Sequence, residues 1–162
     1  ISKISALELL ENENITDDGL KHIPNVKILT SSSNKITDEG LKYVKYIKIL
    51  KIRKNQNVTD EGLKNIMITQ NSMSRLKELE ISHNKNITNE GLKYVPNIKR
   101  LKLPHNENIT NEGLKYVPNL EILEMDNNDN ITEDCFKYIT NISNIRKLKV
   151  RSVIKIPKKC AY

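Results

Sequence analysis

The sequence is poor in aromatic residues: its 162 residues include six Tyr, one Phe and no Trp. A buried core must therefore be built from aliphatic side chains. Only two cysteines are present, Cys135 and Cys160, which is too few for a disulfide framework. The sequence also shows no signal peptide and no apolar run long enough to cross a bilayer. Because the chain begins with Ile1 rather than Met, its targeting stays open.

Lys, Ile and Asn dominate the composition, with 22, 22 and 21 residues, and Lys outnumbers Arg by 22 to 5. This bias resembles the composition of proteins from A/T-rich genomes, such as those of giant amoeba-infecting viruses. The formal net charge is +7, which permits an acidic or nucleic-acid partner without requiring either. At this length the chain can bury the core of one domain, and we expect residues 1–162 to form one.

One phrase recurs through the chain. NITNEGLKYVPN occurs twice without change, at residues 86–97 and 108–119, and four variants occupy residues 14–25, 35–46, 57–68 and 130–141. All five glycines take the same place in these phrases, and Cys135 takes that place in the sixth. Self-similarity at a period of about 20 to 50 residues is the signature of a solenoid or array. The phrase therefore marks a stacked structural unit and not a reaction centre.

A second pattern, apolar-x-x-apolar-x-apolar-x-x-Asn, runs between these phrases and ends at Asn12, Asn34, Asn55, Asn84, Asn106 and Asn128. Over residues 4–150 it resembles the leucine-rich repeat family, and the ITDEGL half is similar to the cysteine-containing subtype, with Asn in the Cys place. The resemblance implies an α/β solenoid, with a curved parallel β-sheet on the concave side and short helices on the convex side. We expect about seven strands and six helical units. The resemblance also implies an Asn ladder between adjacent repeats.

The repeated phrase carries the signals of a short helix. A Thr stands at each expected N-cap, acidic residues follow it, and a Lys lies five residues beyond it, as the helix dipole favours. Pro24, Pro96 and Pro118 stop three of the helices, so each helix is expected to be about two turns long. A Gly at the third helical position costs up to about 1 kcal/mol against Ala, which indicates a place with no room for a larger side chain.

Equivalent residues of a parallel stack lie about 4.8 Å apart and form columns. On the strand face one column alternates in sign from Lys51 to Lys149, and we expect its charges to pair laterally. This face also holds most of the basic excess, and Ala6, Ile28 and Ile49 form an apolar strip on it. We predict a partner-binding patch on this face, formed by Ile28, Ile49, Lys51, Arg53, Lys99, Arg100 and Lys102.

No arrangement of residues in the sequence points to catalysis. His83 and His105 share a column, but a metal site needs a third ligand, and Asn127, the next residue of the column, is a poor one. No nucleophile motif, phosphate-binding loop or carboxylate pair is recognisable. We therefore predict no catalytic, cofactor-binding or metal-binding residues and no enzyme activity. Six N-x-[ST] sequons at near-regular spacing would crowd one flank with glycans, which favours an intracellular protein, cytoplasmic or nuclear.

Function is expected where the repeats differ. Residues 66–75 add seven residues between a helix and a strand, in the form of an extended helix or a convex bulge, and residues 151–162 are expected to cap the last repeat. The leading hypothesis is a non-enzymatic protein-interaction module that uses the strand face. Two alternatives stay open: the substrate-recognition part of a ubiquitin-ligase adaptor, which repeats of this subtype resemble, and binding of a phosphate-rich polymer through the basic face. The lack of aromatic residues on that face gives nucleic-acid binding no further support.

Overall fold

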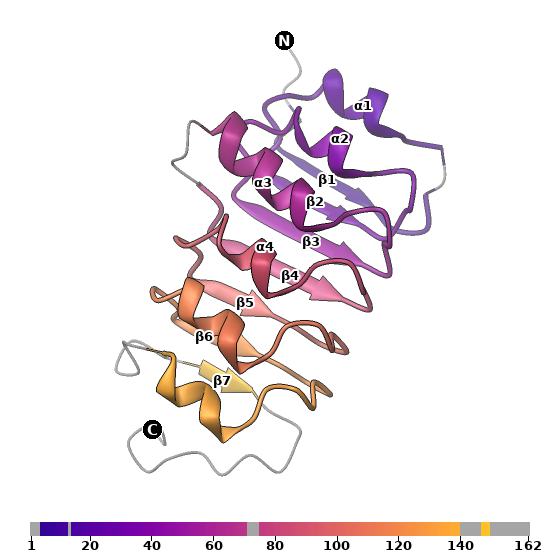
Figure 1. Cartoon of the computed structure of the whole chain (residues 1–162). Helices are drawn as coiled ribbons and strands as arrows, with labels where there is room; N and C mark the ends of the chain where they lie inside the picture. Colours follow the sequence, from indigo (N-terminus) through magenta and orange to yellow (C-terminus); the bar gives the residue numbers. More distant parts are fainter. Residues whose placement is uncertain (1–3, 13, 71–74, 140–146, 150–162) are drawn as a thin grey trace.

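The chain folds into a stack of repeats in which one parallel β-sheet faces one row of short helices (Figure 1). The computed structural model describes residues 4–12, 14–70, 75–139 and 147–149. Within these ranges seven strands pair in chain order, each parallel to the next, in an open sheet. They are β1 (Ala6–Leu9), β2 (Ile28–Ser31), β3 (Ile49–Arg53), β4 (Glu78–Ser82), β5 (Arg100–Lys102), β6 (Ile122–Glu124) and β7 (Lys147–Lys149). The expected α/β solenoid is confirmed.

Each of the first six strands is followed by one helical segment in the other layer. The segments are α1 (Asp17–Lys21), α2 (Asp38–Leu41), α3 (Asp60–Thr69), α4 (Asn89–Leu92) and the 3₁₀ helices η1 (Asn111–Tyr116) and η2 (Glu133–Lys137). The prediction of about two turns for every helix was wrong, because α2 and α4 have four residues and only α3, with ten, exceeds two turns. In α2 the C-cap Lys42 N–H already donates to the carbonyl three residues back, so the chain tightens and turns towards the next strand.

The register places equivalent residues side by side, as the sequence predicts. Ala6 pairs with Ile28, and Ile28 pairs with Ile49. The charged column is Glu8, Thr30, Lys51, Glu80, Lys102, Glu124 and Lys149. Because side chains alternate across a strand, both columns lie on the sheet surface that faces away from the helices. We call this surface the strand face.

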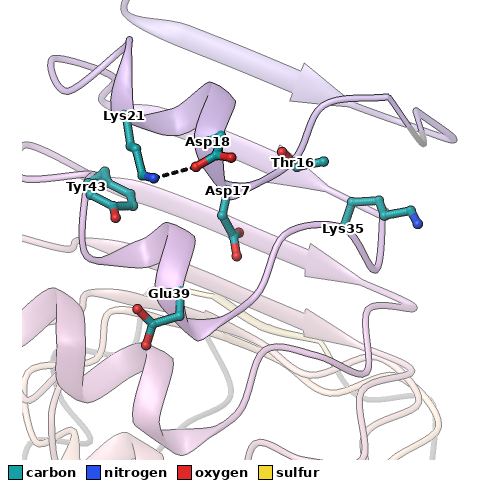
Figure 2. A pocket seen from close by; sticks show the side chains of 7 residues that line it. All are labelled: Thr16, Asp17, Asp18, Lys21, Lys35, Glu39 and Tyr43. Carbon is teal, nitrogen blue, oxygen red and sulfur yellow. Dashed lines mark hydrogen bonds and ion pairs between the residues drawn. The ribbon is translucent and has the colours of Figure 1, made fainter.

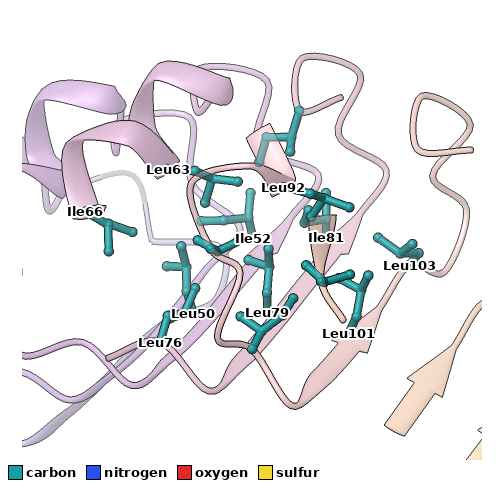
Figure 3. Close-up of a cluster of buried hydrophobic side chains, with 14 of the residues drawn as sticks. Leu50, Ile52, Leu63, Ile66, Leu76, Leu79, Ile81, Leu92, Leu101 and Leu103 are labelled. Atoms are coloured by element: carbon teal, nitrogen blue, oxygen red, sulfur yellow. The ribbon is translucent and has the colours of Figure 1, made fainter. Parts of the chain in front are cut away.

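The core lies between the two layers and is aliphatic. Leu50, Leu79 and Leu101 of three successive strands are fully buried, and Leu63 and Leu92 of the helices reach them from the other side (Figure 3). The half-buried Tyr43, Tyr94, Tyr116 and Tyr138 pack against this core from the helix layer. Since a one-turn helix does not persist alone in water, the stacking of these side chains is what keeps the helices folded.

The Asn at the end of each strand links its repeat to the preceding one. Asn55 Nδ2 donates to the carbonyls of Ser33 at 2.5 Å and Ile36 at 2.8 Å, while its Oδ1 accepts the N–H groups of Asn57 and Val58 at 2.8 and 2.9 Å. Asn84, Asn106 and Asn128 are buried in the same place and also donate to the preceding repeat. The expected Asn ladder is therefore present, and it satisfies buried turn backbone that would otherwise be costly.

The second repeat departs from the prediction: Asn34 is exposed, and Ser33 takes the buried ladder position. The reason is a one-residue deletion in the turn. In the other described repeats a residue with left-handed backbone (φ 52–55°) stands directly before the ladder Asn, at Glu11, Lys54, His83, His105 and Asn127. The second repeat has no such residue between Ser31 and Ser33. The short Ser side chain then bonds only within its own turn, accepting the N–H of Lys35 at 3.0 Å.

A second ladder joins the helix starts. Asp38 Oδ1 accepts the Thr59 N–H at 2.8 Å and Asp38 Oδ2 accepts the Thr59 hydroxyl at 2.7 Å; the Thr59 oxygen in turn accepts the Glu61 N–H at 3.1 Å. Each first acidic residue after the N-cap Thr therefore orients the cap of the next repeat. The same clamp joins Asp17 to Thr37 and Asp60 to Thr88. Asn89 and Asn111 likewise accept the N–H of Thr110 and Thr132 at Oδ1, but there the amide Nδ2 donates to the Thr hydroxyl oxygen. We call it the Asp/Asn–Thr clamp.

The clamp explains the glycines. A Cβ on Gly62 would lie 2.5 Å from Asp38 Oδ1 and 2.9 Å from Leu41 Cδ1, so the carboxylate of the preceding repeat occupies the space that Gly leaves empty. Gly40, Gly91 and Gly113 face the clamp residue of their preceding repeats in the same way. Close packing at these positions was predicted, but its cause is a neighbouring side chain and not the backbone.

The insertion at residues 66–75 extends α3 to Thr69, which confirms one of the two expected forms. Gln70, the buried C-cap residue of α3, donates from Nε2 to the Ile47 carbonyl at 3.2 Å and so ties the end of the helix to the segment just before β3. Residues 71–74 and the expected cap at 151–162 lie outside the described residues.

The Asp/Asn–Thr clamp predicts that a Gly→Ala substitution lowers stability by different amounts at equivalent glycines in two copies of the repeated phrase. Gly62→Ala should lower the free energy of unfolding by about 2–3 kcal/mol, because the new methyl group displaces a carboxylate fixed by two hydrogen bonds. Gly19→Ala is the matched control, since its Cβ would meet only Ile15 Cγ2 at 3.0 Å; its cost should stay below about 1 kcal/mol. Urea unfolding of the two variants measures both values. Equal destabilisation would contradict the clamp.

Candidate interaction surface

The charges of the helix layer are paired within each repeat. Six Lys residues each lie beside the acidic residue three positions earlier: Lys21 with Asp18, Lys42 with Glu39, Lys64 with Glu61, Lys93 with Glu90, Lys115 with Glu112 and Lys137 with Asp134. A polar hollow of about 390 Å³ lies between α1 and α2 (Figure 2). Its Lys21 is paired with Asp18, and its Asp17 is held by Thr37 in the clamp. These groups serve the scaffold, and we place no site here.

His83 and His105 lie together on the side where the strands end. Their rings stack with centroids 4.5 Å apart, and they line a hollow of about 460 Å³ with Lys85 and Glu107. His83 Nδ1 lies 2.9 Å from Ser82 Oγ. Loss of hydration lowers the pKa of His83, and the nearby His105 and Lys54 lower it further. Within the described ranges no group of three His, Cys, Asp or Glu residues is placed to hold a metal.

The strand face carries two contrasting areas. The first, which we call the apolar column, consists of Ala6, Ile28 and Ile49 on β1, β2 and β3. Ile28 is 36% exposed, which is high for an isoleucine in the middle of a sheet, and Ile49 is half-buried. The register brings the two predicted isoleucines next to each other. They form a small apolar surface open to solvent.

The second area, the ion-pair network, is centred on Glu78 and Glu80 of β4, each only 7% exposed. Lys51, Arg100 and Lys102 surround Glu78 at 3.9, 3.3 and 4.0 Å. Arg53 Nε donates to Glu80 Oε1 at 2.6 Å, and this hydrogen bond raises the pKa of the guanidinium above its ordinary value. Lys102 also lies 3.7 Å from Glu124 of β6. The network continues to β7 through Lys147, 2.8 Å from the same carboxylate.

The ion-pair network shows that most of the predicted basic contact residues are already paired within the chain. Lateral pairing along the charged column is present between Lys102 and Glu124, but Lys51 pairs diagonally, with Glu78 of the neighbouring column. Four of the five predicted basic contacts (Lys51, Arg53, Arg100 and Lys102) are thus engaged by acidic side chains of the same chain. Sequence reasoning missed the role of Glu78 and Glu80 as the centre of a network.

Lys99 differs from these four. It lies where β5 begins and pairs with Glu121 at 2.5 Å, away from Glu78 and Glu80. A hollow of about 230 Å³ opens on the strand face beside Lys102, lined by Glu80, Pro104, Glu124 and Asp126 as well. The strand face therefore combines an exposed apolar column, a neutralised centre and a small polar hollow.

The sequence model of the leucine-rich repeat family matches residues 25–44, 45–67, 73–95 and 96–117, which is more than half of the chain. The chain belongs to the leucine-rich repeat family. Leucine-rich repeat proteins typically mediate protein–protein interactions and generally serve as non-enzymatic modules. A comparison with curated proteins gave no match.

Solved structures share the leucine-rich repeat fold at low sequence identity. An internalin (inlF) from Listeria monocytogenes is 20% identical, with TM-score 0.55, over 98% of this chain and 58% of its own. A chain of the Toll–Spatzle complex from Drosophila is 19% identical, with TM-score 0.63, over 96% of this chain and 21% of its own. A chain of the TLR13–ssRNA13 complex is 18% identical, with TM-score 0.58, over 81% and 20%. The leucine-rich repeat chain described here thus spans just over half of that internalin and about a fifth of the other two.

These likenesses show the fold alone, so the surface must be judged on its own residues. Across the described ranges no helix combines the length and the apolar character that a membrane crossing requires. The predicted contact residues fall into three groups: the apolar Ile28 and Ile49, the four paired cations of the network, and Lys99 at the side of the sheet.

The first prediction from this surface concerns Glu78. Glu78→Gln leaves Lys51 and Arg100 without their carboxylate, and we expect it to lower the free energy of unfolding by about 1–2 kcal/mol, between the values of exposed and buried pairs. Glu90→Gln removes an exposed helix-layer pair with Lys93 and should cost about 0.5 kcal/mol or less. Thermal or urea unfolding compares the two. A cost for Glu78→Gln no greater than for Glu90→Gln would show that the network does not stabilise the sheet.

The second prediction concerns the stacked histidines. Because the pKa of His83 is lower in the folded chain than in the unfolded chain, the unfolded state takes up the proton first as the pH falls below about 6.5. Stability should therefore decrease through this range until the pH is below the folded pKa. His83→Asn, which suits the left-handed backbone, should reduce this decrease relative to the original chain. Urea unfolding at pH 5 and pH 7.5 tests it; equal pH dependence in the variant and the original chain would refute it.

Proposed function

We propose that this leucine-rich repeat chain is a non-enzymatic module that binds a protein partner through its strand face, with the apolar column at the centre of the contact. The observation that carries the proposal is the exposure of Ile28 beside Ile49 on a rigid sheet. Solenoids offer such extended faces as binding surfaces. Binding energy concentrates in a few apolar anchors that lose contact with water, and these two side chains are the anchors that the face provides.

The surroundings of the apolar column fit this role. Lys51 lies on β3, two residues after Ile49 and beside Thr30 of β2. Its ion pair with Glu78 holds the ammonium group in place within the sheet. An ordered polar border around an apolar centre keeps water out of a contact without adding much energy itself. The ion-pair network supplies that border on the β4 side.

Of the two alternative functions, binding of a phosphate-rich polymer through the strand face has less support. Lys51, Arg53, Arg100 and Lys102 would have to leave Glu78 and Glu80 before they could neutralise phosphates. The ubiquitin-ligase adaptor alternative uses the same face to bind a protein and differs only in what that protein is. Its adaptor part would lie outside the repeats, so both functions share one step, the recognition of a protein segment.

The proposal predicts that a bound peptide depends on the two isoleucines. Peptides selected from a displayed random library against the intact chain should bind the double variant Ile28→Asp, Ile49→Asp at least about 30-fold more weakly, because two anchors of the contact are lost. Ile68→Asp is the matched control: Ile68 is 54% exposed on α3 in the helix layer, and this variant should bind as the original chain does. Titration calorimetry measures both.

Circular dichroism and thermal unfolding establish that each variant keeps the fold. If a well-folded Ile28→Asp, Ile49→Asp variant binds the selected peptides unchanged, or if Ile68→Asp loses them, the contact does not lie on the apolar column and the proposal is wrong.

A further inference from the structure

A row of exposed lysines lies along one side of the sheet. The Lys residues of the helix layer are paired within their repeats, and the cations of β3 and β5 are paired across the strand face with Glu78 and Glu80 of β4. On the side where the strands begin, which is the left side of the sheet in Figure 1, the pattern is different. Successive repeats place a Lys there directly before the strand: Lys27, Lys48, Lys77 and Lys99. We call these four residues the lysine column.

The backbone fixes the lysine column in register. Lys48 N–H donates to the Lys27 carbonyl at 2.7 Å, Lys77 N–H to the Lys48 carbonyl at 2.8 Å, and Lys99 N–H to the Lys77 carbonyl at 2.9 Å. Neighbouring members therefore stand about one strand spacing apart, roughly 4.8 Å. All four side chains are exposed. A row of like charges at this spacing is unfavourable on its own and is relieved by counterions or by an acidic partner.

The lysine column has little acidic compensation. Lys99 pairs with Glu121, the residue that continues the column in the next repeat. Among the residues that the structure describes, Lys27, Lys48 and Lys77 have no carboxylate within 4.0 Å. Two further cations, Lys45 and Arg75, precede the same strands and are exposed as well. Along this side the second to fifth repeats thus present six basic side chains, and the sixth repeat adds one acidic residue, Glu121.

The lysine column borders the apolar column directly. Lys27 precedes Ile28 in the chain and Lys48 precedes Ile49, so each of these two isoleucines has an unpaired ammonium group at the side where its strand begins. Charge and apolar surface are therefore combined within two adjacent repeats. A partner that uses both must offer carboxylates and apolar side chains a few ångströms apart.

We propose that the lysine column binds an acidic, extended peptide segment of the protein partner, whose apolar side chains rest on the apolar column. This inference rests on the function proposed above and specifies the chemistry of the partner. In an extended chain, residues two apart point the same way, about 6.6–6.8 Å from each other. The flexible Lys side chains span the difference between this spacing and that of the strands.

Nucleic acid fits the same side less well. Single-strand binding relies on aromatic side chains on which bases stack. Here the exposed aromatic residue is Tyr46, and the Arg75 guanidinium carbon already covers its ring at 5.4 Å from the centroid. A phosphate backbone also offers no apolar group that could contact Ile28 and Ile49. The acidic peptide accounts for both neighbouring columns.

The test uses two fluorescent peptides, GELELELELG, whose leucines are two residues apart, and its serine form GESESESESG, together with a decauridine RNA, each titrated against the whole chain by anisotropy at low salt. The leucine peptide should bind more tightly than both other probes. The double variant Lys48→Gln, Lys77→Gln should bind the leucine peptide at least about fivefold more weakly than the original chain does. Its affinity should also depend less on the salt concentration. The matched control is Lys35→Gln, Lys85→Gln, which removes the same charge from exposed lysines on the side where the strands end and should stay within about twofold of the original chain.

Each outcome decides the matter. If the original chain does not bind the leucine peptide, if both lysine variants lose binding equally, or if decauridine binds more tightly, the inference is wrong. If Lys48→Gln, Lys77→Gln binds normally while Ile28→Asp, Ile49→Asp does not, the inference fails and the proposed strand-face function stands. If none of these substitutions changes binding, both fail.

Discussion

A repeat of about 22 residues cannot satisfy its own turns, and in this chain the neighbouring repeat supplies the missing hydrogen bonds. Asn55 holds two carbonyls of the preceding turn, and Asp38 holds the N–H and hydroxyl of the following Thr59. Both ladders lie in the turns that lead from a strand to the next helix, with Asn55 only four residues before Thr59. They fix the repeats at one spacing, and the aliphatic core, the one-turn helices and the columns of the strand face all depend on that spacing.

This constraint also decides which residues are available for function. Most polar side chains of the repeated phrase are used by the ladders or by ion pairs inside one repeat, and the centre of the strand face is neutralised by Glu78 and Glu80. The side chains that the scaffold does not use include the apolar column on β1–β3 and most of the lysine column beside it. The proposed binding function follows from these two surfaces, and they differ from the repeat consensus that surrounds them.

Much of the fold could be predicted from the sequence, because a strict repeat converts spacing along the chain into neighbours in space. The adjacency of Ile28 and Ile49 and the order of the charged column follow directly from that rule. The ladder position of Ser33 did not, because counting forward from the strand hides a deletion in the turn; counting back from buried Ile36 would have found it.

Other features depend on the direction in which a side chain points, which its place in a column does not specify. A column gives the order of charges, but it does not say that Lys51 leans towards Glu78 while Arg53 takes Glu80. Likewise the glycine at position 62 indicates that a larger side chain has no room there, but only the structure shows that Asp38 occupies this space. The central claim, that the apolar column is the contact surface, is tested most directly by methyl NMR of isoleucine-labelled protein titrated with a selected peptide. The account predicts large shifts for the Ile28 and Ile49 methyl groups and none for Ile68; shifts confined to the helix layer would contradict it.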